Sequence, residues 1–223
     1  MTKVVTVKRR ALAANEERAE RLRARFAASG TLVANLISSP GSGKTSLLEA
    51  TVRALDDELT TAVIEGDVAT ENDADRIRAL GVPAHQILTG GASHLDARLV
   101  ETGIEEGGLP EVDILFIENV GNLICPTTYD LGEDFKVVLL SVAEGDDKPV
   151  KYPAIFARAE VAVVTKSDLL PHVPFDLDSV KSQIASLNPN GTVLVTSSLQ
   201  GDGMDEWFDL LRARLQAKRQ SLG

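Results

Sequence analysis

The sequence predicts a doubly wound α/β fold, with a mostly parallel sheet flanked by helices. Short runs of Val, Ile and Leu alternate with amphipathic segments from residue 31 to the end of the chain. Parallel strands have this near-continuous apolar composition because helices cover both faces of their sheet. Turn residues bound each run, which is typical of strands joined by crossover helices. The expected strands are 32–37, 61–64, 86–88, 113–117, 135–142, 161–164 and 192–195.

Amphipathic segments between these strands predict the helices. One further helix is expected before the first strand, because residues 8–29 place apolar side chains at helical spacing and Gly30 supplies a stop. We expect residues 1–30 to form an added N-terminal helix that packs on the sheet edge or on a partner subunit. Residues 31–223 should form one domain. The other expected helices are 44–56, 72–80, 93–105, 177–187 and 203–218.

Composition excludes several classes of protein. The 223 residues include 33 acidic and 23 basic side chains, a net charge of −10. Such a surface repels phosphate backbones and anionic lipids, so neither nucleic acid nor a membrane is an expected partner. The single cysteine, Cys125, allows no intramolecular disulfide. No apolar run approaches the roughly 20 residues of a membrane helix, and the first residues lack a signal peptide's apolar core. We therefore expect a cytoplasmic protein.

A phosphate-binding loop follows the first predicted strand. The string SSPGSGKTS at residues 38–46 matches the pattern G-x-x-x-x-G-K-[ST] except at its first glycine, which is Ser38 here. In this pattern, backbone N–H groups surround the β-phosphate at a helix N-terminus, the lysine reaches the β/γ-phosphates, and the hydroxyl ligates Mg²⁺. The residues expected to bind nucleotide are Gly41, Ser42, Gly43, Lys44, Thr45 and Ser46.

The choice of base is predicted by T-K-S-D at residues 165–168, which ends the strand at 161–164. Asp168 can accept hydrogen bonds from both N1–H and the exocyclic amine of guanine, whereas adenine offers no such pair of donors. The stem of Lys166 can lie along the purine face. Ser197, after the last predicted strand, is a candidate for contact with the base oxygen. The expected ligands are therefore GTP and GDP.

Two acids end predicted strands and are candidates for the magnesium site. The carboxyl ends of parallel strands open onto the ligand crevice, so Asp67 and Glu118 should face the metal. We expect Thr45 to ligate Mg²⁺ directly, and the two acids to hold metal-bound or attacking water. The string E-N-V-G at 118–121 is similar to the D-x-x-G switch of GTPases, in which the amide of the glycine, here Gly121, senses the γ-phosphate. Alternatively, Glu118 only ends a strand.

Several longer strings resemble one family, the HypB GTPases of the SIMIBI class, over about residue 31 to the C-terminus. This resemblance implies a P-loop fold with catalytic roles for Lys44, Asp67 and Glu118. It also implies a GTP hydrolase that inserts nickel during [NiFe] hydrogenase maturation. Expected partners are a second copy in a GTP-dependent homodimer, a HypA-type nickel chaperone and the hydrogenase large-subunit precursor. The matching strings are EGDVAT at 65–70, DADRI at 73–77, ENVGNLICP at 118–126, EGDDKP at 144–149 and KYP at 151–153.

The metal site implied by the resemblance is altered in this chain. Family members hold a metal at the dimer interface through a Cys-His pair and a second Cys, where this sequence has Ser93, His94 and Cys125. A serine hydroxyl is a poorer ligand than a thiolate for nickel or zinc. Two copies of His94 and Cys125 across a two-fold axis could together supply four ligands. Alternatively, Cys125 only packs and His94 caps the helix at 93–105.

Two other functions stay open. One is a GTP-gated scaffold that docks partners with degraded metal handling, which the serine at position 93 favours. The other is a GTPase chaperone for another metalloenzyme, such as urease or a cobalamin-dependent mutase, which the string ENVGNLICP argues against.

Overall fold

A computed structural model describes residues 2–67 and 72–222 of the chain. Within this part, seven strands form one sheet in the order β3-β2-β4-β1-β5-β6-β7, and every neighbouring pair is parallel. The predicted α/β fold is confirmed. The strands are β1 (Leu32–Ser38), β2 (Thr61–Asp67), β3 (Ala84–Leu88), β4 (Ile114–Glu118), β5 (Phe135–Ser141), β6 (Val161–Thr165) and β7 (Thr192–Val195).

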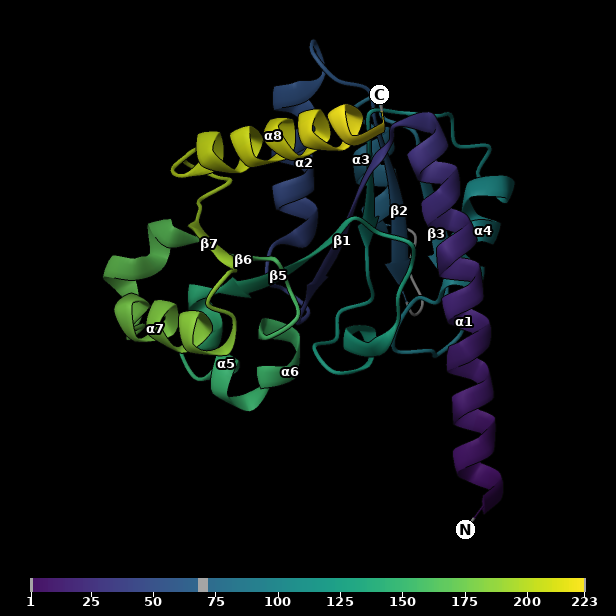
Figure 1. Cartoon of the computed structure of the whole chain (residues 1–223). Coiled ribbons are helices and arrows are strands. Elements are labelled where there is room, and N and C mark those ends of the chain that lie inside the picture. Colours follow the sequence, from purple (N-terminus) through teal and green to yellow (C-terminus); the bar gives the residue numbers. More distant parts are fainter. Residues whose placement is uncertain (1, 68–71, 223) are drawn as a thin grey trace.

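Helices cover both faces of the sheet, as Figure 1 shows. Buried residues alternate between the two faces along each strand; Ala34 of β1, for example, packs on one face and Val33 on the other. The first face carries α2, α3 and α8, and the second carries α1, α4, α6 and α7. The helices are α1 (Thr2–Ser29), α2 (Lys44–Leu55), α3 (Asn72–Arg78), α4 (Ala97–Glu106), α5 (Lys148–Lys151), α6 (Pro153–Phe156), α7 (Leu177–Leu187) and α8 (Met204–Leu222).

Strand order places a crevice at the carboxyl end of β1. The chain builds the β4-β2-β3 side from one edge of β1 and the β5-β6-β7 side from the other edge. In open parallel sheets, ligands bind outside the carboxyl ends of the strands where the order reverses in this way. The phosphate-binding string follows β1, so the topology puts it at this crevice.

The ends of several helices differ from the prediction. The helix expected from residue 93 begins at Ala97, because the side chain of Asp96 accepts a hydrogen bond from the Leu99 N–H at 2.8 Å and caps it. The short helices α5 and α6 were not predicted, since each has fewer than five residues and a proline in its first turn. No helix in the described part of the chain is long and apolar enough to cross a membrane.

Helix α1 is anchored to two loops by one buried side chain. Asn15 is 7% exposed. Its Nδ2 donates to the carbonyl of Asp130 and its Oδ1 accepts from the N–H of Ala97, each at 2.8 Å. Arg23 adds two hydrogen bonds to the carboxylate of Asp130, at 2.6 and 2.7 Å. In Figure 1, the N-terminal part of α1 extends beyond the other elements.

We expect Asn15→Ala to lower the free energy of unfolding by about 2 kcal/mol or more, because it leaves the Asp130 carbonyl and the Ala97 N–H without their partner. Glu17→Ala on the same helix is the matched control. It removes an exposed ion pair with Arg21, which should change stability by less than about 1 kcal/mol. Denaturant unfolding of both variants measures the difference. Equal stabilities would show that α1 does not depend on this anchor.

Candidate functional site

The loop between β1 and α2 has the geometry of a phosphate cradle. Gly41 and Gly43 have φ of 79° and 88°, a region that side chains disfavour, which explains glycine at both positions. Lys44 begins α2 and is 8% exposed. Its Nζ donates to the hydroxyl of Ser38 at 2.9 Å. The serine that replaces the first glycine of the pattern therefore orients the lysine.

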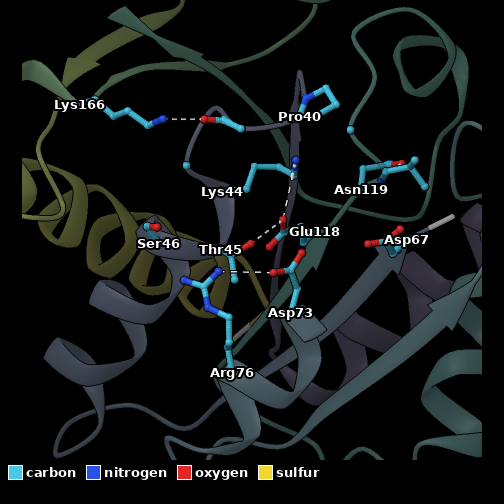
Figure 2. A pocket seen from close by; sticks show the side chains of 15 residues that line it. Pro40, Lys44, Thr45, Ser46, Asp67, Asp73, Arg76, Glu118, Asn119 and Lys166 are labelled. Carbon is cyan, nitrogen blue, oxygen red and sulfur yellow. Dashed lines mark hydrogen bonds and ion pairs between the residues drawn. The ribbon is translucent and has the colours of Figure 1, made fainter. Parts of the chain in front are cut away.

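Residues from the other half of the sheet hold this loop from outside. Thr165, at the end of β6, donates its hydroxyl to the Ser42 carbonyl at 2.6 Å, and Lys166 Nζ donates to the Gly41 carbonyl at 2.7 Å (Figure 2). Lys166 has φ of 59° and is the one non-glycine residue with positive φ in the described chain. Strained backbone of this kind persists where surrounding contacts over-determine it. The strand that carries the predicted base-recognition residues thus also fixes the loop's carbonyls.

Two further braces come from a segment to which sequence reasoning assigned no role. Glu144 accepts a hydrogen bond from the Ser42 hydroxyl at 2.6 Å, and Lys148 Nζ donates to the Ser39 hydroxyl at 3.2 Å. The same two residues form an ion pair with each other at 3.5 Å. Both residues belong to the string EGDDKP. The only indication of a role for them in the sequence was that this string resembles a family pattern.

The acidic side of the site is built on β2 and β4. Thr45 donates its hydroxyl to Glu118 Oε1 at 3.1 Å, and Lys44 Nζ lies 3.7 Å from the same oxygen. Glu65 stands opposite Glu118 in the register of the two strands and is 2% exposed. Burial, followed by the charge of Glu118, raises the pKa of Glu65. Burial likewise raises the pKa of Glu118, against the lowering effect of Lys44.

These oxygens suit a hard cation such as Mg²⁺. The carboxyl groups of Glu65 and Glu118 face each other, and the buried Glu65 Oε1 and Glu118 Oε2 receive no hydrogen bond from any other described residue. A divalent ion prefers carboxylate and hydroxyl oxygens, and it would relieve the cost of packing two acids together. Sequence reasoning identified Asp67 and Glu118 but missed Glu65. The signal was available, because Glu65 is two residues before Asp67 and therefore on the same face of β2.

One cavity of about 450 Å³ joins the loop to Asp67 and Glu118. Figure 2 shows the side chains that line it. Gly121 also lies against the loop, since a Cβ there would come within 2.9 Å of Pro40 Cγ. Residues 68–71, which belong to the string EGDVAT, lie outside the described part of the chain. The cavity brings together these predicted site residues: Gly41, Gly43, Lys44, Thr45, Ser46, Asp67, Glu118, Gly121 and Lys166.

Two candidate base-binding residues, Asp168 and Ser197, do not line this cavity. Asp168 follows β6, and its Oδ1 accepts a hydrogen bond from the Ser197 hydroxyl at 2.6 Å. The Ser197 N–H donates to the Asp202 carbonyl at 2.8 Å. The hydroxyl of Ser197 therefore orients the carboxylate of Asp168. Lys166 connects this region with the cavity, because it precedes Asp168 and its ammonium reaches the phosphate loop.

The candidate nickel ligands lie on two loops that contact each other. The Asn122 side chain donates to the Ser93 carbonyl at 3.2 Å. His94 stacks on Tyr129 with 3.9 Å between ring centroids, and burial lowers its pKa. Asp96 caps α4, so the alternative in which His94 caps this helix is wrong. Among the described residues, no three His, Cys, Asp or Glu side chains are arranged to hold a metal, and Cys125 is half-buried.

Comparison with known proteins agrees with this geometry. Residues 32–195 match the family model of the CobW/HypB/UreG nucleotide-binding domain. The chain is 50% identical to the hydrogenase maturation factor HypB of Escherichia coli K12 over 90% of its own length and 69% of that protein. It is 40% identical to the hydrogenase/urease maturation factor HypB of Helicobacter pylori over 98% of this chain and 90% of that protein.

A crystal structure of Helicobacter pylori HypB in complex with nickel superposes with a TM-score of 0.86 at 40% identity, covering 94% of this chain and 97% of the other. The fold, the phosphate loop and the acids at the strand ends thus occur together in a chain whose sequence is 40% to 50% identical to these HypB proteins over most of its length. The chain belongs to the CobW/HypB/UreG family of P-loop GTPases and, within it, to the HypB hydrogenase maturation factors.

Proposed function

We propose that this GTPase acts as a metallochaperone that inserts nickel during [NiFe] hydrogenase maturation in the cytoplasm. The main support for a guanine-nucleotide site is that the phosphate loop and the start of α2 contact both the segment before Asp168 and the acid at the end of β4. The loop carbonyls bind Thr165 and Lys166, which lead directly into Asp168, while Thr45 and Lys44 contact Glu118. A guanine nucleotide spanning from Asp168 to Glu118 would contact every predicted element of the site.

Each side chain has a defined task in hydrolysis. The loop's inward N–H groups and Lys44 bind the β- and γ-phosphates, so they offset charge where it develops. Thr45, Asp67 and Glu118 would hold Mg²⁺, which supplies charge neutralisation between the β- and γ-phosphates. Asp67 and Glu118 would orient the water that takes part in hydrolysis. The amide of Gly121 would sense the γ-phosphate, which is supported by the packing of Gly121 beside Pro40 of the loop.

Guanine selectivity rests on Asp168 and on the serine that orients it. A carboxylate fixed by the Ser197 hydroxyl presents its remaining lone pairs to N1–H and the exocyclic amine of guanine. Because an ionised acid makes the stronger hydrogen bonds, the pair of contacts should exclude ATP.

Asp168→Asn tests the proposed site. The amide keeps one acceptor and replaces the other with donors, which oppose the guanine N1–H and suit xanthine. Losing charge-assisted bonds of about 1.5–3 kcal/mol each should weaken GTP binding by about tenfold to a thousandfold. Calorimetry with GTP and XTP measures this, and XTP binding is the control for an intact fold. Unchanged GTP affinity in the variant would remove Asp168 from the base site.

Nickel handling is proposed for the two loops that carry His94 and Cys125. The support is the contact of these loops through Asn122 and Ser93, together with the nickel complex of the Helicobacter pylori relative. The described residues of one copy offer too few ligands, so the metal would lie between two copies in a GTP-dependent homodimer. A HypA-type chaperone would deliver nickel, and the hydrogenase large-subunit precursor would receive it.

Two alternatives have specific support. Ser93 in place of a family cysteine favours a GTP-gated scaffold with degraded metal handling, because a hydroxyl is a weak ligand for nickel. The name of the Helicobacter pylori relative includes urease, which favours a second metalloenzyme as client. Measuring nickel and zinc binding separates the scaffold from the metallochaperone.

We expect weak binding of nickel or zinc at half a metal per chain, and only with a non-hydrolysable GTP analogue. Cys125→Ala should abolish it, because half of the proposed ligands are lost, whereas Ser93→Cys should increase affinity by adding a thiolate per chain. Equilibrium dialysis of the three proteins, each with GDP and with the analogue, gives the comparison. Tight binding by the monomer, or binding that survives Cys125→Ala, would place the ligands elsewhere.

A further inference from the structure

A third cation lines the nucleotide cavity. Besides Lys44 and Lys166, the described lining contains Arg76, from α3, close to Thr45 and Asp73 in Figure 2. Lys44 is engaged by Ser38 and Glu118, and Lys166 is engaged by a loop carbonyl. Arg76 is therefore the cation of this lining that is not bound to the phosphate loop or to a proposed metal ligand.

Two partly buried acids hold the guanidinium of Arg76: the side chain of Glu49 is 17% exposed and that of Asp73 is 36% exposed. Arg76 Nε donates to Glu49 Oε1 at 2.9 Å and its Nη1 lies 3.4 Å from Asp73 Oδ1. The Arg76 side chain is 47% exposed. Because the guanidinium itself is half exposed, its ion pairs are weakened by solvent, so exchanging them for a more highly charged partner costs little. Guanidinium has five N–H donors in a planar fork, which matches the oxygens of a phosphate.

GTP hydrolysis needs positive charge on the metal side of the cavity. The water oxygen bonds to the γ-phosphorus as the bond from that phosphorus to the β–γ bridging oxygen breaks. The electron pair goes to the bridging oxygen, one water proton stays on the inorganic phosphate and the other leaves to solvent. Negative charge is spread over the γ-phosphoryl oxygens and the leaving oxygen in the transition state, so a cation there accelerates the step.

We propose that Arg76 is a catalytic residue, whose guanidinium leaves Glu49 and Asp73 to contact the γ-phosphoryl oxygens of GTP in the transition state. This inference rests on the proposed nucleotide site and names a residue to which the sequence assigned no role. The competing explanation is structural: Arg76 connects α3 to α2 through Glu49 and does nothing else.

The chain supplies matched controls for both explanations. Arg78 lies on the same helix and pairs with Asp75 at 2.7 Å, three residues before it, as Arg76 pairs with Asp73. Its Nε donates to the carbonyl of Ala84 rather than facing the cavity. Glu49→Gln weakens the connection between helices while leaving the guanidinium of Arg76 present and freer to move.

Single-turnover GTP hydrolysis and GDP affinity should be measured for the parent, Arg76→Ala, Arg76→Lys, Arg78→Ala and Glu49→Gln. We expect Arg76→Ala to slow hydrolysis about 100-fold, a loss typical of removing one transition-state contact, with GDP affinity unchanged since GDP lacks the γ-phosphate. Arg76→Lys should recover only part of the rate, because an ammonium lacks the planar fork. Arg78→Ala should match the parent, and Glu49→Gln should match or exceed it.

Parent-like hydrolysis by Arg76→Ala would overturn the proposal. So would a loss in Glu49→Gln equal to that in Arg76→Ala, since this would assign the effect to the connection between helices. Weaker GDP binding in Arg76→Ala would also overturn it, by placing Arg76 in ground-state binding. A parent that binds no guanine nucleotide would overturn the proposed function itself, and this outcome is distinct from the other three.

Discussion

The site depends on one requirement: the backbone carbonyls of a phosphate-binding loop need hydrogen-bond donors. When successive N–H groups turn inward toward an anion, the carbonyls of the same peptides turn outward and need donors of their own. The carbonyls of Gly41 and Ser42 receive theirs from Lys166 and Thr165. Those donors lie at the end of β6 and directly after it, two strands away from β1, so the loop carbonyls gain these partners only when β1, β5 and β6 are paired.

This dependence links the two ends of the candidate nucleotide site. The peptide that carries Asp168 begins with the residues that hold the phosphate loop. On the other side of β1, Thr45 and Lys44 contact Glu118, whose strand pairs with β2 and brings Glu65 alongside. Two neighbouring buried acids oppose each other while both are charged. A cation bound there would remove this repulsion. Two acids that destabilise each other without a cation therefore favour the binding of a metal ion.

Features that depend on local sequence patterns could be predicted from the sequence. Buried strands, the phosphate loop and the acid at the end of β4 each follow from residues close together in the chain. Contacts between distant segments were not predictable: Glu144 with Ser42 joins residues 102 positions apart, and Arg76 enters the cavity only because α3 packs beside α2. The start of α4 was wrong by four residues, because both Ser93 and Asp96 are acceptable caps and only tertiary packing distinguished them.

The anchor of α1 has a mechanical consequence for the two loops with the candidate nickel ligands. Ala97 is three residues after His94 and Asp130 is five residues after Cys125, and the single carboxamide of Asn15 binds the backbone at both. A carboxamide is planar and short, so it fixes the positions of the two backbone groups relative to each other. Opening one loop relative to the other therefore requires breaking one of the two hydrogen bonds of Asn15. A displacement of α1 would shift both loops in the same direction.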